Sequence, residues 1–245
     1  MSRFYAPKEN IKGGRILIEG EEAHHALDVM RLKGDDKVVV FDGTGAEYTG
    51  FIKEADKRRK RVIVEIVRTE RPSPEKAPEI TLAQAIPKKN KMNYIVEKAT
   101  ELGIKRIMPL VTARTIVRVD TEASGKKVAK WRRIATEAAK QCGRRDVPEV
   151  SEVLSYKETA GMLEAYDLVL FAYLAKETVP LKEAIGGFTS GKILVFIGPE
   201  GDFTPDEAAL LKNTNARFVS LGRRVLRSET AGLFLLSVLN YEFSG

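Results

Sequence analysis

Cysteine and histidine are almost absent from this chain of 245 residues. The single cysteine, Cys142, excludes an internal disulfide and fits a reducing compartment. The two histidines are the neighbours His24 and His25, so no ordinary zinc site can be assembled and we expect no metal. No apolar run approaches the roughly 20 residues of a membrane-spanning helix, and the N-terminus lacks the apolar core of a signal peptide. We therefore expect a cytoplasmic protein that does not enter a membrane.

Two common nucleotide-binding motifs are missing as well. The chain contains no Gly-x-x-x-x-Gly-Lys-Ser/Thr, which excludes a P-loop, and no Gly-x-Gly-x-x-Gly after a strand, which excludes the usual dinucleotide fingerprint. A Ser-His-Asp hydrolase would have to use His24 or His25, which lie far in sequence from the glycine-rich loops near the C-terminus. Packing or a contact with phosphate is the better interpretation of this histidine pair.

Positive charge is concentrated in the middle of the chain. Residues 73–150 hold 17 Lys and Arg against nine Asp and Glu, a net charge of +8, whereas residues 1–72 carry +2 and residues 151–245 carry −3. Lysines and arginines can simply solvate helix faces. A net charge of this size within 78 residues nevertheless favours a nucleic acid as the partner.

Prolines divide the chain into two predicted domains. Pro72, Pro74 and Pro78 cannot continue a helix or a central strand, so residues 72–78 are predicted to be a linker. Residues 1–71 are expected to form a small β-barrel because short β-like runs alternate with turn residues, and one helix is expected from Glu21 to Arg31. The expected strands are Arg15–Glu19, Lys37–Asp42, Glu47–Glu54 and Arg61–Val67.

Strands alternate with helices in residues 79–245, which predicts an α/β domain with a largely parallel sheet. Thr204 and Glu207 flank Pro205 in a capping box, and Ser228 is expected to cap a final buried helix. The expected strands are Ile80–Ile86, Arg106–Val111, Leu168–Tyr173, Lys192–Ile197 and Arg217–Leu221, and the other expected helices are Lys91–Leu102 and Lys126–Gln141.

Two loops are the candidates for a binding site. Gly198–Phe203 follows an apolar strand, and its glycines let a ligand approach the backbone, although a tight turn into a capped helix would look the same. Leu221–Ala231 places three arginines and a glutamate between a buried strand and a buried helix. Unpaired charge is costly there, so these side chains are expected to face a cleft and a charged substrate.

These residues resemble a known family. Together with Gln141-Cys142-Gly143-Arg144 and the run Lys91–Gly103, the two loops resemble the bacterial 16S ribosomal RNA uridine-N3 methyltransferases (RsmE type) of the SPOUT superfamily. The resemblance extends over the whole chain, and His24–Asp35 resembles the PUA-like RNA-binding barrel of that family. It implies a trefoil-knotted, parallel-sheet α/β domain after a small PUA-like β-barrel, and a homodimer.

The resemblance also implies S-adenosylmethionine as the cofactor. The residues that would bind it lie in three segments: Leu174; Ile197, Gly198, Pro199 and Gly201; and Leu221, Gly222, Val225, Leu226, Thr230 and Ala231. Where the family usually shows a second glycine, this chain has Asp202. Because Asp tolerates the left-handed conformation better than most residues, we expect the loop still to form, and Asp202 is the position at which its shape can differ from that of the family.

Methylation at N3 of uracil requires removal of a proton and stabilisation of a developing anion. Arg227 is the expected cation for the anion, and Glu229 or Glu200 could accept the proton if burial raises its pKa. Glu229 could equally be a carboxylate that complements a helix dipole. The residues expected to bind 16S ribosomal RNA of the small subunit are Arg114, Arg118, Arg144 and Arg145, and more weakly Arg3, Arg31 and Lys33.

Two other functions remain open at this point. A SPOUT ribose 2′-O-methyltransferase would share the knot and the cofactor but methylate another atom. A noncatalytic ribosome assembly factor could use the same barrel and basic helix to bind RNA. Binding of S-adenosylmethionine would exclude the noncatalytic assembly factor. It would not distinguish the ribose methyltransferase from the uracil N3 methyltransferase.

Overall fold

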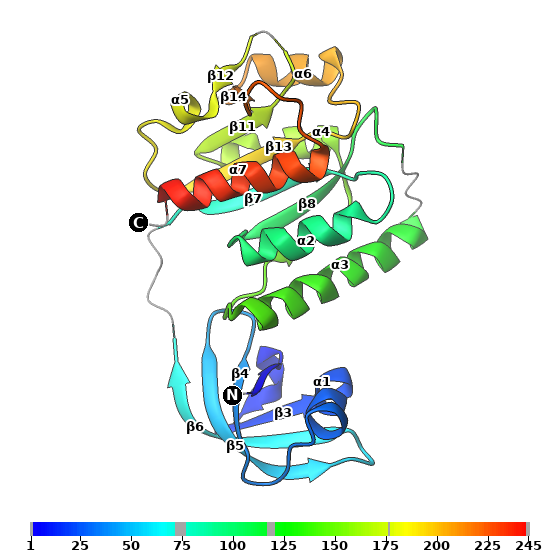
Figure 1. Ribbon diagram of the computed structural model, residues 1–245, viewed down its shortest axis with the longest axis vertical. Coiled ribbons are helices and arrows are strands. Elements are labelled where there is room, and N and C mark those ends of the chain that lie inside the picture. The colour runs from blue at the N-terminus through cyan, green and yellow to red at the C-terminus, as the bar shows by residue number, and fades with distance from the viewer. Residues whose placement is uncertain (1, 72–76, 117–120, 176, 244–245) are drawn as a thin grey trace. The chain divides into compact units, whose positions relative to one another are not determined.

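The computed structural model describes residues 2–71, 77–116, 121–175 and 177–243 (Figure 1). Two compact units are present, one formed by residues 1–75 with 139–147 and the other by residues 76–138 with 148–245. Most of the linker expected at 72–78 lies outside the described residues. None of the described helices is long and apolar enough to cross a bilayer.

The N-terminal unit is one curled β-sheet. Its strands are β1 (Ser2–Tyr5), β2 (Ile11–Lys12), β3 (Arg15–Glu19), β4 (Lys37–Phe41), β5 (Glu47–Asp56) and β6 (Arg61–Glu70), in the order β1-β4-β5-β6-β3-β2. Alternate residues of β1, β3, β4, β5 and β6 meet in a single buried cluster around Phe4, Ile18 and Val40. Since both outer parts of the sheet contribute to this one core, the sheet is rolled in the way expected of a small barrel.

The helix expected from Glu21 to Arg31 is divided. It consists of α1 (Gly20–His24) and a π-helical turn, η2 (His25–Val29), and a 3₁₀ turn, η1 (Lys8–Asn10), precedes them. Ala23, Ala26 and Leu27 pack into the core of the N-terminal unit. Helical periodicity places Ala23, Leu27 and Met30 on one side of this segment; the first two are buried, but Met30, after the change in hydrogen bonding, is 42 % exposed.

A segment from the middle of the chain completes the N-terminal unit. Backbone hydrogen bonds join Gly45 to the carbonyl of Arg145 and Val147 to the carbonyl of Gly43, at 3.1 and 3.0 Å. Lys140, at the end of a long helix, forms an ion pair with Glu22 at 2.7 Å. The unit is therefore made from two separate stretches of sequence, which the division of the chain at its prolines did not predict.

The C-terminal unit contains a parallel sheet in the order β10-β8-β7-β13-β11-β14-β12, with β9 also paired to β8. All of its described strand pairings are parallel, as the alternation of strands and helices predicted. The strands are β7 (Glu79–Ala85), β8 (Arg106–Val111), β9 (Glu149–Val150), β10 (Leu154–Ser155), β11 (Leu168–Ala172), β12 (Val179–Pro180), β13 (Lys192–Ile197) and β14 (Ala216–Ser220).

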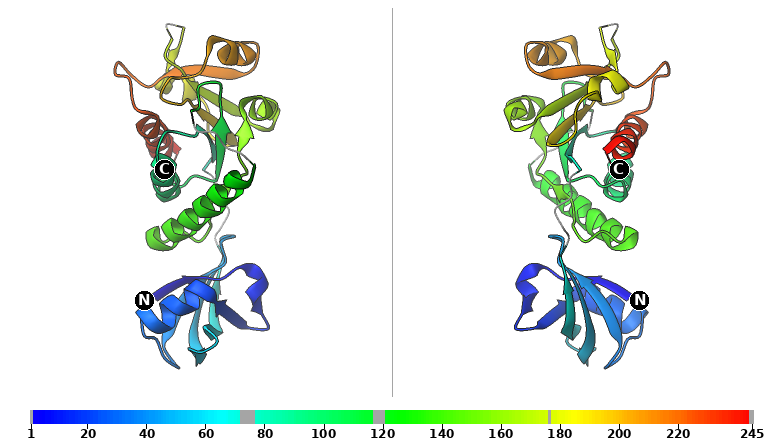
Figure 2. Two further views of the ribbon diagram at one scale, coloured as in Figure 1. Left: turned by 90° about the vertical axis from the view of Figure 1, so that its right-hand side faces the viewer. Right: turned by 90° about the vertical axis from the view of Figure 1, so that its left-hand side faces the viewer.

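Helices cover both faces of this sheet (Figure 2). The helices α2 and α7 lie together on one face, and α4 and α6 lie on the other, where Tyr156 and Leu211 join an aromatic core with Phe171 and Phe196. The bounds are α2 (Lys91–Glu101), α3 (Thr121–Cys142), α4 (Tyr156–Ala160), η3 (Leu163–Ala165), α5 (Leu181–Ile185), α6 (Pro205–Lys212) and α7 (Ser228–Phe243).

The last helix differs from its prediction in one respect. Leu235, Leu236 and Leu239 are buried, but Phe234 is 42 % exposed and Tyr241 is 86 % exposed. The expectation that α7 is buried all round was therefore wrong, because only one side of it faces the sheet and α2. The capping box of α6 is confirmed, since Thr204 accepts the N–H of Glu207 and Glu207 accepts the N–H of Thr204.

Candidate functional site

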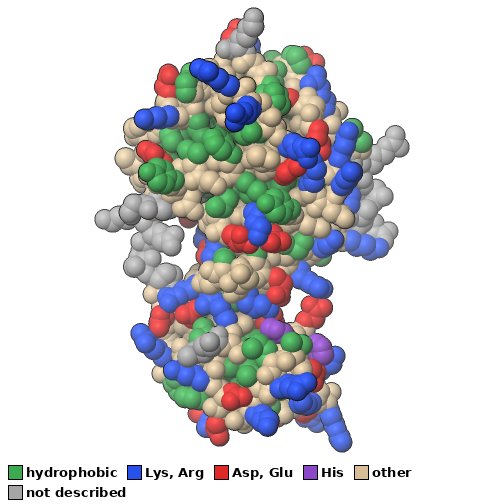
Figure 3. Space-filling view, viewed as in Figure 1, with side chains coloured by type: hydrophobic (Ala, Val, Ile, Leu, Met, Phe, Trp, Pro, Cys, Tyr) green, Lys and Arg blue, Asp and Glu red, His purple; other side chains and the backbone are tan. Residues whose placement is uncertain are grey.

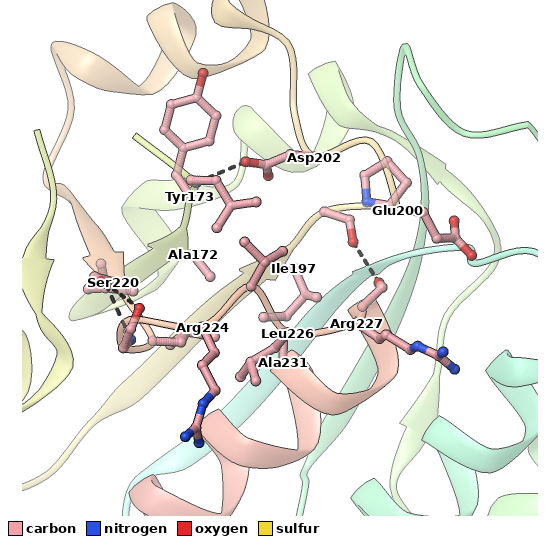
Figure 4. A pocket seen from close by; sticks show the side chains of 18 residues that line it. Ala172, Tyr173, Ile197, Glu200, Asp202, Ser220, Arg224, Leu226, Arg227 and Ala231 are labelled. Atoms are coloured by element: carbon pink, nitrogen blue, oxygen red, sulfur yellow. Dashed lines mark hydrogen bonds between the residues drawn. The ribbon is translucent and has the colours of Figure 1, made fainter. Parts of the chain in front are cut away.

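A pocket of about 240 Å³ opens at the carboxyl ends of β11, β13 and β14 (Figure 4). This is the edge of a parallel sheet at which ligands bind in α/β proteins. Its wall consists of the segments that follow these three strands and the first turn of α7: Ala172, Tyr173, Leu174, Ile197, Gly198, Pro199, Glu200, Asp202, Val219, Ser220, Leu221, Gly222, Arg224, Val225, Leu226, Arg227, Ser228 and Ala231.

The loop after β13 is held tightly at both of its ends. A Cβ atom at Gly198 would lie 2.9 Å from the carboxylate of Asp202 and 3.2 Å from its Cα, so only glycine fits this position. At the other end the ring of Phe203 is buried against Phe171, with ring centroids 4.4 Å apart. The loop is therefore anchored in the core and presents backbone atoms to the pocket.

Asp202 links this loop to the segment after β11. Its backbone has a φ of 58°, the left-handed conformation that the sequence predicted it would tolerate. One carboxylate oxygen accepts the N–H of Leu174 at 2.9 Å, and the other accepts the N–H of Phe203 at 2.8 Å. Burial raises the pKa of Asp202, although both hydrogen bonds and the nearby Arg114 act in the opposite direction. A glycine here would provide neither contact.

Ser228 ties the same loop to the middle of the sheet. Its hydroxyl donates to the carbonyl of Gly198 at 2.6 Å and accepts from the side-chain N–H of Gln84, on β7, at 2.9 Å. Ser228 is the first residue of α7, and the carbonyl of Arg227 accepts the N–H of Ala231 at 2.8 Å. The expectation that Ser228 caps the helix was therefore wrong, because its side chain is engaged by residues of two other strands and their loops.

The loop after β14 forms the open side of the pocket. Gly222 has a φ of 113°, which favours glycine, and Val225 is 74 % exposed. In Figure 4, Arg227 and Glu200 lie on the same side of the pocket, and Arg224 points elsewhere. The carboxylate of Glu200 accepts the backbone N–H of Lys88 at 3.0 Å. The cation of Arg227 and the carboxylate of Glu200, from two different loops, therefore both line this cavity.

Glu229 has a different environment from Glu200. It does not line the pocket, and its carboxylate forms an ion pair with Lys91, on α2, at 2.9 Å. Burial raises its pKa, but the hydrogen bond from Lys91, the helix backbone and the charges of Lys91 and Arg227 outweigh burial and leave the pKa below its usual value. The raised pKa on which a role for Glu229 as proton acceptor depended is therefore not present.

Arg114, expected to bind RNA, instead turns toward the loop after β13. Its guanidinium donates to the carbonyl of Gly201 at 2.5 Å and lies 3.4 Å from that of Phe203. A Cβ atom at Gly201 would lie 3.3 Å from the Arg114 side chain, so the small residue leaves room for it. Gly201 contributes to the pocket through this support and not as a wall residue.

Most of the other arginines expected to bind RNA are engaged within the N-terminal unit. Arg3 pairs with Glu47 and donates to the carbonyl of Arg144. Arg145 lies 2.6 Å from Glu70, and Arg144 pairs with Asp146 at 2.8 Å. Arg31 and Lys33 are exposed on the loop after η2, and Arg118 lies outside the described residues.

The structure brings together most of the residues expected around the cofactor. Of the eleven, nine line the pocket, and Gly201 and Thr230 do not. Sequence reasoning missed Ala172, Tyr173, Val219 and Ser220, whose positions at the ends of the predicted strands were the signal available for finding them. The described residues contain no group of His, Cys, Asp and Glu side chains that could hold a metal ion.

Comparisons with known proteins agree with this geometry. Residues 74–240 match an RNA methyltransferase domain, and residues 18–65 match an RNA methyltransferase PUA domain. The chain is 31 % identical to ribosomal RNA small subunit methyltransferase E of Bacillus subtilis, over 92 % of this chain and 89 % of that protein. It is also 31 % identical to the protein of the same name from Aquifex aeolicus, over 98 % and 99 %.

Solved structures give the same result. A putative methyltransferase from Legionella pneumophila with bound S-adenosylmethionine has a TM-score of 0.88 at 31 % identity, covering 98 % of this chain and 97 % of that one. Ribosomal RNA small subunit methyltransferase E of Neisseria gonorrhoeae, bound to S-adenosylmethionine, has a TM-score of 0.85 at 28 % identity, covering 99 % and 98 %. The chain therefore belongs to the RNA methyltransferase family that contains the ribosomal RNA small subunit methyltransferases E.

Proposed function

We propose that this chain transfers the methyl group of S-adenosylmethionine to N3 of a uridine in 16S ribosomal RNA of the small subunit. The observation that carries the proposal is the pocket at the ends of β11, β13 and β14, with Arg227 and Glu200 on one side of it. The names of the curated relatives and the S-adenosylmethionine bound in similar structures support the substrate class and the cofactor. A cytoplasmic location, where ribosomal RNA is modified, accords with this function.

The pocket fits S-adenosylmethionine. Gly198 leaves no room for a side chain, so backbone groups of the loops remain available to bind polar atoms of the cofactor. Ile197, Leu221 and Leu226 supply apolar surface for its adenine ring. When bound, the cofactor supplies a methyl group already activated on a sulfonium, so the protein has mainly to orient the uracil and manage one proton.

Arg227 and Glu200 divide the remaining chemistry. The N3–H of uracil must lose its proton, and Glu200 is assigned as the acceptor because it lines the pocket whereas Glu229 does not. Glu200 is exposed, so this assignment rests on its position and not on the burial expected from the sequence. Negative charge then develops over the ring, and the guanidinium of Arg227 stabilises it at O2 or O4. Glu229, paired with Lys91, holds the first turn of α7 next to Arg227 and leaves proton transfer to Glu200.

The chain path is consistent with a SPOUT trefoil knot. Strand β14 lies beyond β11, yet the chain after it returns so that Ser228 contacts Gly198 after β13 and Gln84 on β7. The segment 221–228 therefore crosses back over the sheet edge close to the loop after β11. We infer that this crossing threads the knot and that the pocket lies within it.

A homodimer is the second structural part of the proposal. The exposed aromatic rings of Phe234 and Tyr241 on α7 and of Tyr94 on the adjacent α2 are unusual for a monomer surface. A second copy covering them would lie near the pocket, because α7 begins at its wall. We further propose that residues 79–245 carry out catalysis and that the unit that begins with residues 1–71 binds RNA.

The test is to locate the methyl group. The protein is incubated with labelled S-adenosylmethionine and unmodified small ribosomal subunits, and the product nucleoside is identified by mass spectrometry. 3-Methyluridine is expected. A methyl group on a ribose 2′-oxygen would overturn the assignment in favour of the other SPOUT activity, and absence of cofactor binding by calorimetry would favour an assembly factor.

The role of Arg227 has its own test. Arg227→Ala should lower kcat about 100- to 1,000-fold, the usual effect of removing one group that stabilises transition-state charge, and leave cofactor affinity nearly unchanged. Arg223→Ala is the matched control, because Arg223 is exposed in the same loop but does not line the pocket. Equal rates for the two variants would remove Arg227 from the mechanism.

A further inference from the structure

The hairpin that joins β5 to β6 carries the densest positive charge in the N-terminal unit. Residues 57–61 are Lys57, Arg58, Arg59, Lys60 and Arg61. The first four are exposed, and we call residues 57–60 the hairpin tip. Residues 53–61 contain six Lys and Arg against two Asp and Glu, a net charge of +4.

The hairpin tip is a defined turn and not a loose charged loop. The carboxylate of Asp56 accepts the backbone N–H of Arg59 at 3.0 Å and lies 3.8 Å from its guanidinium. Lys60 has a φ of 47°, and the cross-strand pair Asp56 and Arg61 closes the ladder below it. The turn therefore fixes the backbone from which its cations project, which lowers the backbone entropy lost when they bind a partner.

The charges of the hairpin tip are available to a partner. Across the described part of the chain, no carboxylate pairs with Lys57, Arg58 or Lys60, and Arg59 has only the long contact with Asp56. The other arginines expected to bind RNA differ, since Arg3, Arg144 and Arg145 are occupied by carboxylates of their own unit. Lys57, Arg58 and Lys60 can therefore bind phosphates without first breaking an ion pair within the protein.

Further cations lie on the same part of this unit. The loop that carries Arg31 and Lys33 is joined to β5 by hydrogen bonds between Asp35, Asp36 and Ile52, at 2.8 and 3.0 Å. Ile52 is four residues before Asp56, a distance of roughly 13 Å along a strand. Figure 3 shows Lys and Arg side chains over a broad area of this unit, with Asp and Glu side chains among them. Arg31 and Lys33 are thus carried by a loop bonded to the strand that leads into the hairpin tip.

We propose that the hairpin tip binds the sugar–phosphate backbone of the RNA substrate and supplies most of the salt-sensitive affinity of the N-terminal unit. Consecutive side chains of a turn diverge, so they suit several phosphates along a strand and not one deep anion site. Phosphate contacts of this kind position an RNA without reading its sequence. The proposal rests on the chain's action on RNA but not on which atom of uridine is methylated.

Salt dependence measures the contacts directly. Each phosphate contact contributes about 0.7 to 0.9 to the slope of log affinity against log salt, so three lost contacts lower the slope by about 2 to 3. Between 50 and 200 mM salt, the wild-type affinity should then fall roughly 15- to 40-fold more than that of a variant lacking three of these cations.

The experiment compares two triple variants. One carries Lys57→Ser, Arg58→Ser and Lys60→Ser and keeps Arg59, whose contact with Asp56 holds the turn. The control removes the same charge near the opposite end of β3, with Lys8→Ser, Lys12→Ser and Arg15→Ser, all exposed positions. Binding to a 16S ribosomal RNA transcript is measured by fluorescence anisotropy over a salt series, and methyl transfer is measured on small subunits.

The hairpin variant should show the reduced salt slope and a raised KM for small subunits, with cofactor affinity and kcat at saturating substrate unchanged. The control should retain the wild-type slope. Equal slopes for both variants, reduced or not, would overturn the proposal. A hairpin variant that binds the transcript normally but binds assembled subunits weakly would also overturn it, and would indicate an acidic protein partner.

The two proposals fail separately. If the hairpin variant loses salt-sensitive RNA binding while the methyl group is found on an atom other than N3, the hairpin inference stands and the assignment of the product is wrong. If 3-methyluridine forms and the hairpin variant binds RNA as the wild type does, the reverse holds. Circular dichroism melts provide the check on folding, since all three replaced side chains are exposed.

Discussion

The hydroxyl oxygen of Ser228 connects the first turn of α7 to the loop after β13 and to strand β7. This oxygen lies 2.6 Å from the carbonyl of Gly198 and 2.9 Å from the amide nitrogen of Gln84, and the residue is 5 % exposed. Ser228→Ala removes only this atom. One of the two side-chain N–H groups of Gln84 keeps its acceptor, the carbonyl of Ala85 at 3.0 Å. The other N–H and the carbonyl of Gly198 both lose their partner.

The size of the effect follows from the partner left without a hydrogen bond. A buried polar group that loses its hydrogen-bond partner costs roughly 1 to 3 kcal/mol, and the side-chain N–H of Gln84 is such a group. For a chain of this length, 1 kcal/mol lowers Tm by about 2 to 4 °C, so Ser228→Ala should melt about 2 to 12 °C below the wild type. If the same cost falls on the cofactor loop, affinity for S-adenosylmethionine should drop about 5- to 150-fold.

Calorimetry with S-adenosylmethionine and thermal melts measure the two quantities. Ser237→Ala is the matched control, since its hydroxyl also donates to a carbonyl, that of Leu233 at 2.8 Å, but lies exposed on the same helix. Its Tm and affinity should stay near those of the wild type. If Ser228→Ala and Ser237→Ala behaved alike, the hydroxyl of Ser228 would not support the loop, and the account of the pocket given above would be refuted.

Three further predictions concern the loop after β13. Gly198→Ala should weaken cofactor binding at least tenfold, because the new Cβ would lie 2.9 Å from the Asp202 carboxylate and 3.2 Å from its Cα. Arg114→Ala should lower cofactor affinity severalfold, since the carbonyl of Gly201 loses its donor, while the salt slope for RNA stays unchanged. Asp202→Asn should alter the pH dependence of Tm: burial raises the pKa of Asp202, so its contribution to stability is full below its ordinary pKa of 3.8 and is lost as the pH rises. The Tm difference should therefore shift in favour of the variant between about pH 4 and pH 7.

Each of these predictions has a clear failure. Gly125→Ala, in α3 with open space around it, is the control for Gly198→Ala, and equal effects would contradict the steric argument. If Arg114→Ala reduced the dependence of RNA affinity on salt, Arg114 would be a phosphate contact, as the sequence predicted. A Tm difference between wild type and Asp202→Asn that stayed constant with pH would show that burial of the carboxyl group does not alter its protonation.

Periodicity and turn chemistry were sufficient to predict most elements of the fold. Arg15–Glu19, Arg106–Val111 and Lys192–Ile197 were expected as strands and are β3, β8 and β13 with the same bounds. Apolar runs between turn residues are a local signal, and so is the capping box at Thr204 and Glu207. The position of the pocket followed from the same kind of information, because a parallel sheet binds ligands at one edge.

Pairing between distant residues could not be predicted from local patterns. Lys91 and Glu229 are 138 residues apart, and their ion pair lowers the pKa of Glu229, which would have to be raised for this residue to act as the proton acceptor. Ser228 has the residue type and position of a helix cap, yet Gln84 and Gly198 use its hydroxyl. Arg145 was expected to bind RNA, but its guanidinium forms an ion pair with Glu70. In each case a charge or a hydroxyl was recognised, and only the fold determined its partner.

Because the N-terminal unit is built from two separate stretches of sequence, it is difficult to exchange between related proteins. A fragment ending before the prolines would lack Lys140 and Arg145, so Glu22 would lose its ion pair with Lys140 and Glu70 would keep only that with Arg68. The backbone of Gly45 would lose its acceptor as well. The unit therefore cannot be exchanged between relatives as one continuous cassette, because residues 139–147 have to travel with residues 1–75. Substitutions in either stretch are expected to be accompanied by substitutions in the other.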